Sequence, residues 1–167
     1  NNPHIKSWKT MGRIGFILNA ISVVTIGSLF FYMIYNHMFE YYYVWSHSDT
    51  SLPTHFIISS FWEGQEGSFW LWMFWQVVIG TVLLFRTKSW ESPVMTFVML
   101  CQTFLASMLI GVEIFGNRIG SSPFILLREA MQAPIFQDPH YLSMIDGKGL
   151  NALLQNYWMV IHPPTLF

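Results

Sequence analysis

Three apolar stretches, each long enough to cross a lipid bilayer, constrain the fold of this chain more than any other feature. They cover residues 14–39, 68–85 and 94–115. An α-helix crosses the roughly 30 Å hydrocarbon core of a bilayer in about 20 residues, and a single segment in lipid can satisfy its backbone polar groups only as a helix. The sequence therefore predicts an all-α fold, a polytopic bundle of transmembrane helices that forms one membrane domain.

The composition agrees with a membrane protein. Charged residues make up 10% of the chain and hydrophobic residues 53%, whereas a soluble domain carries about 25% charged residues. The net charge is −1 and there is no basic run, so we expect a lipid bilayer and no nucleic acid as partner. The single cysteine, Cys101, excludes a disulfide within this chain, and without a CxxCH motif the chain is not itself a c-type cytochrome.

The basic residues predict how the spans are oriented. They lie before the first span and between the second and third, and loop 40–67 has none; the residues are Lys6, Lys9, Arg13, Arg86 and Lys88. Because cytoplasmic loops are enriched in Lys and Arg, we expect loop 86–93 in the cytoplasm. Loop 40–67 and segment 116–162 then lie on the external side, although that segment carries three basic residues, which its three acidic residues offset. Residues 163–167 are expected to begin a fourth span.

Loop 40–67 is crowded with aromatic rings, which a soluble loop would not carry. They are Tyr41, Tyr42, Tyr43, Trp45, Phe56, Phe61 and Trp62. Such rings suit either the membrane interface or contact with a flat apolar ligand. The loop ends in the sequence WEGQEGS, in which Glu63 and Glu66 lie near the start of the second span, where the helix dipole favours negative charge. Its glycines permit either a tight turn or the close approach of a partner backbone or flat ligand.

A second motif, DGKGLNALLQNYWMVIHPP, covers residues 146–164. Asp146 and Gly147 indicate a turn, and the apolar spacing that starts at Leu150 indicates a helix. A proline disfavours helical geometry in the residue before it and is favoured at the first position of a helix. We therefore expect His162 at a break, with a new membrane helix starting at Pro163.

The expected position of His162 suits haem. The positive end of the new helix dipole would keep the imidazole neutral, which is the metal-ligating form, and would attract anions such as haem propionates. The alternative is a histidine that only caps the helix. The remaining histidines, His4, His37, His47, His55 and His140, show no ligand spacing and are expected to be ordinary. Glu113 lies inside the third apolar stretch, and it is either functional or paired in the membrane or already at the interface.

These motifs resemble those of haem-handling membrane proteins of cytochrome c maturation, the CcmF and CcsA type. Members of that family carry a pattern like WGxHEGSLLLW, and this chain reads WEGQEGSFWLW over residues 62–72. They also carry a pattern like DGxDLNPLLQDPxLxxHPPxLY, and this chain reads DGKGLNALLQNYWMVIHPPTLF over residues 146–167. The resemblance covers residues 40–167, and residues 1–39 match in layout only. Gln65 stands where the family has a histidine, so the resemblance implies no ligating or ionisable role for this position.

The resemblance implies that the chain is an N-terminal fragment of a larger protein of a bacterial cytoplasmic membrane. Such proteins bind haem on the outer face and attach it to the CxxCH thiols of apocytochrome c. It implies a non-covalent b-type haem with His162 as an axial ligand to the iron, Trp62 lining the apolar approach and Glu66 ordering the loop. The second haem ligand and a tryptophan-rich segment would follow Phe167.

The expected function is therefore haem delivery or a haem lyase activity, with apocytochrome c and other maturation membrane subunits as partners. One alternative is a haem exporter or chaperone subunit that relays haem without attaching it. A further alternative is a haem-free structural subunit of a membrane complex. In that case His162 would cap a helix and nothing more.

Overall fold

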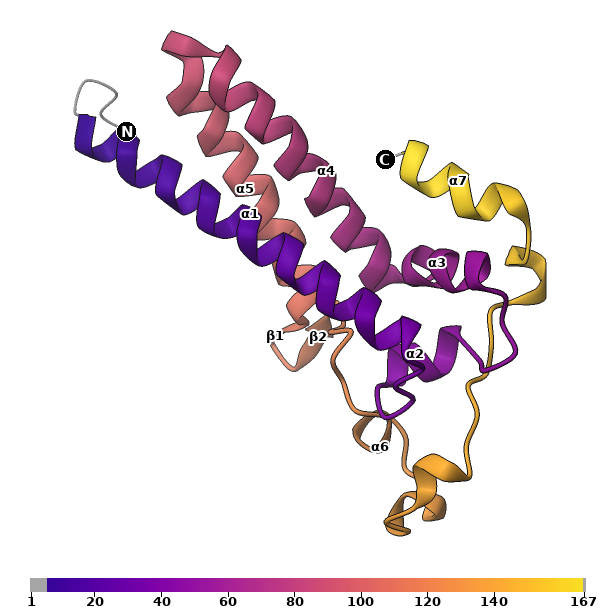
Figure 1. The fold of residues 1–167 in the computed structure, drawn as a ribbon. Coiled ribbons are helices and arrows are strands. Elements are labelled where there is room, and N and C mark those ends of the chain that lie inside the picture. The colour runs from indigo at the N-terminus through magenta and orange to yellow at the C-terminus, as the bar shows by residue number, and fades with distance from the viewer. Residues whose placement is uncertain (1–5, 167) are drawn as a thin grey trace.

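Three long helices form the body of the molecule in the computed structural model, which describes residues 6–166 (Figure 1). They are α1 (Lys6–Tyr35), α4 (Gln65–Arg86) and α5 (Glu91–Ile110), and each is long and apolar enough to cross a membrane. The expected all-α transmembrane bundle is thereby confirmed. Each helix begins before the apolar stretch that predicted it, because its first polar residues join the helix although they do not suit lipid.

The first span ends earlier than the sequence suggested. Its last helical residue is Tyr35, and His37 has a left-handed backbone with φ 50°. The amide of Met38 donates to the carbonyl of Met33 at 3.1 Å, and the amide of His37 donates to Ile34 at 3.1 Å. This pattern is the Schellman motif that closes many helices. The apolar residues 38 and 39 therefore belong to the structure beyond the helix.

The third span also ends early, which moves Glu113 out of the membrane helix. Gly111, with φ 77°, closes α5. A short antiparallel hairpin follows, formed by β1 (Val112–Ile114) and β2 (Asn117–Ile119). Glu113 lies on β1, is exposed and has Arg118 as its Cα partner across the hairpin. The predicted end of the third span at residue 115 was wrong, because Gly111 ends the helix although the apolar run continues beyond it. Of the two alternatives for Glu113, a position inside the membrane helix is therefore excluded.

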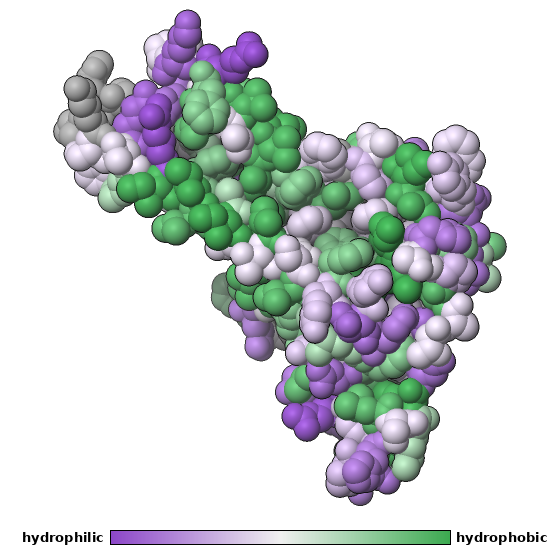
Figure 2. All heavy atoms as spheres, in the orientation of Figure 1, coloured by the Kyte–Doolittle hydropathy of each residue, from purple (hydrophilic) through white to green (hydrophobic). Residues whose placement is uncertain are grey.

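Polar side chains join the long helices inside the bundle. The indole Nε1–H of Trp70 in α4 donates to the carbonyl of Val23 in α1 at 2.7 Å, and Gly27 gives that ring room on α1. The side-chain amide of Gln102 in α5 donates from Nε2 to the backbone carbonyl of Met73 in α4 at 2.9 Å. Such hydrogen bonds to backbone carbonyls hold helices together in lipid. On the face of the molecule seen in Figure 2, the surface along the long helices is mostly hydrophobic, and hydrophilic side chains gather at the end where α1 starts and α4 ends.

Loop 40–67 folds into two helices, α2 (Tyr42–His47) and α3 (Thr54–Glu63). Many of its rings are packed against each other and against α1. The ring centroid of Phe30 lies 4.6 Å from that of Tyr43 and 4.7 Å from that of Phe61. Tyr43 and Phe61 are buried. These rings thus build a second core at this end of the bundle, which we call the aromatic end.

The segment after the hairpin contains short helices. They are α6 (Leu127–Ala130), η2 (Pro134–Gln137), η3 (Tyr141–Ser143) and η4 (Ala152–Leu154). Leu127 is 1% exposed, and its amide donates to the carbonyl of Glu40 at 2.7 Å. The segment is therefore hydrogen-bonded to the start of loop 40–67.

The last element, α7 (Tyr157–Leu166), differs from the expectation in two respects. The helix starts at Tyr157 because the side chain of Asn156 accepts a hydrogen bond from the amide of Trp158 at 3.1 Å, which is how an asparagine caps a helix N-terminus. Pro163 therefore lies inside α7 and does not begin it. The helix expected from Leu150 is also broken, into η4 and α7. Phe167 lies outside the described residues.

Candidate functional site

The three site residues expected from the sequence all lie at the aromatic end, on three different helices. Trp62 is in the last turn of α3, Glu66 in the first turn of α4, and His162 in α7. Figure 1 shows α7 beside α3. The indole Nε1–H of Trp75 in α4 donates to the carbonyl of Pro164 at 3.2 Å, so α7 is also joined to α4.

The junction between α3 and α4 explains the glycines of the first motif. A Cβ atom on Gly67 would overlap the carbonyl oxygen of Phe61, so this position requires glycine for backbone approach. The hydroxyl of Ser68 donates to the carbonyl of Trp62 at 3.1 Å, and its amide donates to the carbonyl of Gly64 at 3.2 Å. Of the alternatives left open by the sequence, the structure supports a tight turn, since the backbone that approaches Gly67 is that of Phe61 in the same chain.

Tyr43 makes the hydrogen bonds that hold this junction together, although no motif in the sequence marks it. Its hydroxyl lies 3.0 Å from the carbonyl of Phe61 and 3.2 Å from that of Ser60, and it accepts a hydrogen bond from the amide of Gly64 at 3.0 Å. Burial raises the pKa of the Tyr43 hydroxyl well above its ordinary value. The residue stays neutral and can donate. No signal separates it in the sequence from the tyrosines on either side.

Glu63 connects the first motif to the second. Its Oε1 accepts a hydrogen bond from the amide of Asn151 at 3.3 Å. Half-burial raises the pKa of the Glu63 carboxyl, and nearby His47 and the Asn151 amide oppose that rise. The ring of His47 stacks on Tyr43, with the two centroids 4.2 Å apart. His47, which the sequence suggested was ordinary, is thus part of a polar cluster at the junction.

The first residues of the second motif form an extended strap against the end of α2. Asp146 accepts hydrogen bonds from the amide of Thr50 at 3.1 Å and from its hydroxyl at 2.7 Å. These bonds hold the pKa of the Asp146 carboxyl below its ordinary value of 3.8. The amides of Lys148 and Gly149 donate to Trp45 and Ser48 at 2.7 and 3.2 Å. The expected turn at 146–147 was wrong, because these contacts hold the segment extended.

A close backbone approach also explains Gly147. A Cβ atom there would overlap the carbonyl oxygen of Ser48. Gly149 has φ +82°, in the left-handed region that favours glycine. The glycines of both motifs thus allow one part of the aromatic end to pack on another.

His162 is exposed on α7. Because His162 lies inside α7, the helix-start dipole expected to act on it does not apply. No group of three or more His, Cys, Asp or Glu side chains that could hold a metal occurs in the described part of the chain. The imidazole is thus a single, accessible candidate ligand.

Trp62 lines an apolar cavity of about 370 Å³ between α1, α3 and α4. Its lining includes Phe31, Phe61, Trp70 and Phe74, but not His162. Glu66 is half-buried at the start of α4. The structure therefore places the three expected residues at one end of the molecule without bringing them into a common pocket.

These features define a class: a helical membrane protein segment in which a folded aromatic loop is fastened to a proline-containing helix that displays a histidine. Comparison with known proteins shows that the chain is similar to the cytochrome c-type biogenesis proteins NrfE and CcmF. NrfE of Haemophilus influenzae is 28% identical over 157 residues, covering 92% of this chain and 21% of its own length. CcmF of Pseudomonas fluorescens is 28% identical over 164 residues, covering 93% of this chain and 20% of its own length.

CcmF of Haemophilus influenzae is also 28% identical, over 137 residues. No protein-family model and no solved structure matches the chain. The predicted resemblance is confirmed: the chain is related to the CcmF and NrfE proteins, and it spans about a fifth of the length of these relatives. Its three apolar helices and these bacterial relatives indicate a bacterial membrane protein.

Proposed function

We propose that this chain takes part in cytochrome c assembly and that its aromatic end binds haem on the outer face of the membrane. His162 would be an axial ligand to the haem iron. The observation that carries the proposal is the exposed imidazole of His162 on a helix fastened to the aromatic end. The names of the relatives, which are cytochrome c-type biogenesis proteins, support the pathway.

The residues around α7 fit the demands on a haem ligand. A metal ligand must be oriented by its surroundings. Asn156 caps the start of α7, Trp75 binds the carbonyl of Pro164 near its end, and Glu63 holds the amide of Asn151 just before it. The helix is thus supported on both sides of His162, and the imidazole is exposed.

The other site residues would act on the surroundings of the haem. Trp62 and its neighbouring rings would provide an apolar approach, and Glu66 would help to order the start of α4. A bound haem supplies the vinyl groups to which the cysteine thiols of an apocytochrome can be joined. This chain's residues would bind and orient, and apocytochrome c and other maturation subunits would be its partners.

A haem-free structural role is the second candidate, and one observation favours it. Gly67, Gly147 and Gly149 are all explained by packing of the chain against itself. The two motifs therefore do not need a ligand to account for their glycines. A haem relay without attachment would use the same residues as the main proposal.

Replacing His162 in the full-length protein tests the proposal. We expect wild-type protein to purify with a Soret absorption band, and His162→Ala to weaken that band or to abolish cytochrome c maturation. His140→Ala is the matched control, since His140 is also exposed but lies on the segment before the strap. Unchanged haem content and unchanged maturation in His162→Ala would refute the ligand assignment and favour the structural role.

A further inference from the structure

The end of the bundle opposite the aromatic end, which we call the basic end, contains a charged cluster that joins two helices. The guanidinium of Arg13 in α1 donates from Nε and Nη2 to the two carboxylate oxygens of Glu91 in α5, at 2.6 and 2.8 Å. The ammonium of Lys9 lies 2.7 Å from the same carboxylate. Glu91 is 4% exposed, whereas the side chains of Lys9 and Arg13 are 39% and 48% exposed.

This cluster has an excess of one positive charge, because two cations share one carboxylate. A guanidinium has five N–H donors and an ammonium has three. The bonds to Glu91 use two donors of Arg13 and one of Lys9. Both cations therefore keep donors for a second anion, and their partial exposure makes those donors accessible.

A cavity of about 280 Å³ lies directly beside the cluster and continues into the apolar part of the bundle. Lys9, Arg13 and Glu91 line it together with Leu84, Met95 and Met99. Gly12 also lines it, and a Cβ atom added there would have no neighbour within 4 Å. The cavity is thus charged on one side and apolar on the other.

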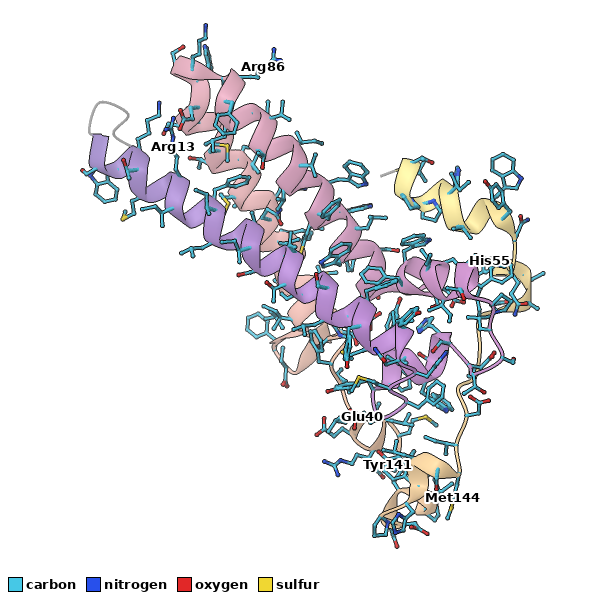
Figure 3. The ribbon with its side chains drawn as sticks, viewed as in Figure 1. Arg13, Glu40, His55, Arg86, Tyr141 and Met144 are labelled. Atoms are coloured by element: carbon cyan, nitrogen blue, oxygen red, sulfur yellow. The ribbon has the colours of Figure 1, made fainter. Side chains whose placement is uncertain are left out.

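The position of the cavity matches the boundary between membrane and water. Lys9 and Arg13 are near the start of α1, and Arg86 is at the end of α4. Figure 3 shows Arg13 and Arg86 at the same end of the molecule. Figure 2 shows hydrophilic side chains at that end and hydrophobic ones farther along the long helices. An occupant therefore needs an anionic group at the tip and an apolar part directed into the bilayer.

We propose that this cavity binds one anionic phospholipid. Its phosphate lies against Lys9 and Arg13, and one acyl chain lies along Leu84, Met95 and Met99. The excess positive charge selects an anionic over a zwitterionic headgroup. The apolar wall selects a lipid over free phosphate. The lipid joins α1 to α5 at the basic end and is independent of haem binding at the aromatic end.

Two variants of the full-length protein test the site without removing the Arg13–Glu91 pair. Gly12→Leu fills the cavity, and Gly15→Leu is its matched control, since Gly15 is on the same helix with open space but does not line the cavity. Lys9→Gln removes the excess charge, and Arg86→Gln is its matched control. Each protein is reconstituted in vesicles of phosphatidylglycerol and phosphatidylcholine and extracted in a mild detergent. Native mass spectrometry then measures which phospholipid stays bound.

We expect wild-type protein to retain one phosphatidylglycerol in preference to phosphatidylcholine. Gly12→Leu should lose it, and Lys9→Gln should bind it roughly fivefold more weakly, while both controls retain it. Equal retention in Gly12→Leu and Gly15→Leu, or equal retention of the two lipids, would overturn the proposal. So would displacement of the phospholipid by inorganic phosphate at millimolar concentration, because the site would then belong to the free anion.

Discussion

The two ends of the helix bundle are held together by different kinds of contact. At the basic end, Arg13 and Lys9 of α1 bind Glu91 of α5, so three side chains join two spans. At the aromatic end, the contacts are mostly hydrogen bonds that involve backbone groups, packed rings and close approaches at glycine, as at Gly67 and Gly147. Charge pairs tolerate small shifts of the helices, whereas close backbone approaches do not. The geometry of the aromatic end is therefore the more tightly defined of the two.

Adding one methyl group at the α3–α4 junction should affect the aromatic end most strongly. Gly67→Ala places a Cβ atom on the carbonyl oxygen of Phe61, so the backbone must move. We expect a loss of at least about 2 kcal/mol in unfolding free energy, measured by denaturation in detergent. Gly12→Ala is the matched control, since a Cβ there meets open space at the basic end. A similar small effect of both substitutions would contradict the proposed difference between the ends.

At the basic end, removing the cation Arg13 should destabilise the protein more than removing the anion Glu91. Arg13→Gln leaves the buried carboxylate of Glu91 with Lys9 alone, whereas Glu91→Gln leaves cations that are already partly exposed and can be hydrated. Removing one partner of a buried charge is costly mainly for the charge that stays buried. We expect Arg13→Gln to lower the melting temperature more than Glu91→Gln does. The reverse order would show that Glu91 is not the buried member of the cluster.

The strap at the aromatic end should show the smallest effect and a defined dependence on pH. The pKa of Asp146 is held below its ordinary value of 3.8 by the hydrogen bonds from Thr50. Its stabilising contribution is therefore complete above about pH 4 and is lost as the pH falls through the lowered folded-state pKa. Asp146→Asn should increase amide exchange at Gly149 near neutral pH. Wild type and variant should converge at strongly acidic pH, and a constant difference down to that pH would argue against the ionised carboxylate.

The sequence predicted the membrane spans well because their composition alone requires helices in lipid. It did not predict α2 and α3, because the rings of loop 40–67 suit an interface as well as a core. Their burial depends on contacts with Phe30 of α1 and Leu150 near the C-terminus, which are distant in the sequence. The strap at Asp146 was missed for the same reason, since a local Asp–Gly signal does not reveal the distant partner Thr50.

The site was predicted in part. The motifs located His162, Trp62 and Glu66, and all three lie at the aromatic end. The local rule for proline placed the start of the last helix at Pro163, but the cap formed by Asn156 places it earlier. Neither Tyr43 nor His47 carries a local signal, because their roles come from the α3–α4 junction.

Chemical rescue of His162 tests the central claim most directly. In the full-length protein, His162→Gly removes the imidazole and leaves the neighbouring contacts of α7 in place. We expect this variant to mature little cytochrome c, and added imidazole to restore maturation, because the free base can occupy the vacated ligand position. A His140→Gly control should mature cytochrome c normally with or without imidazole. Normal maturation by His162→Gly without imidazole, or a loss that imidazole does not restore, would contradict the account.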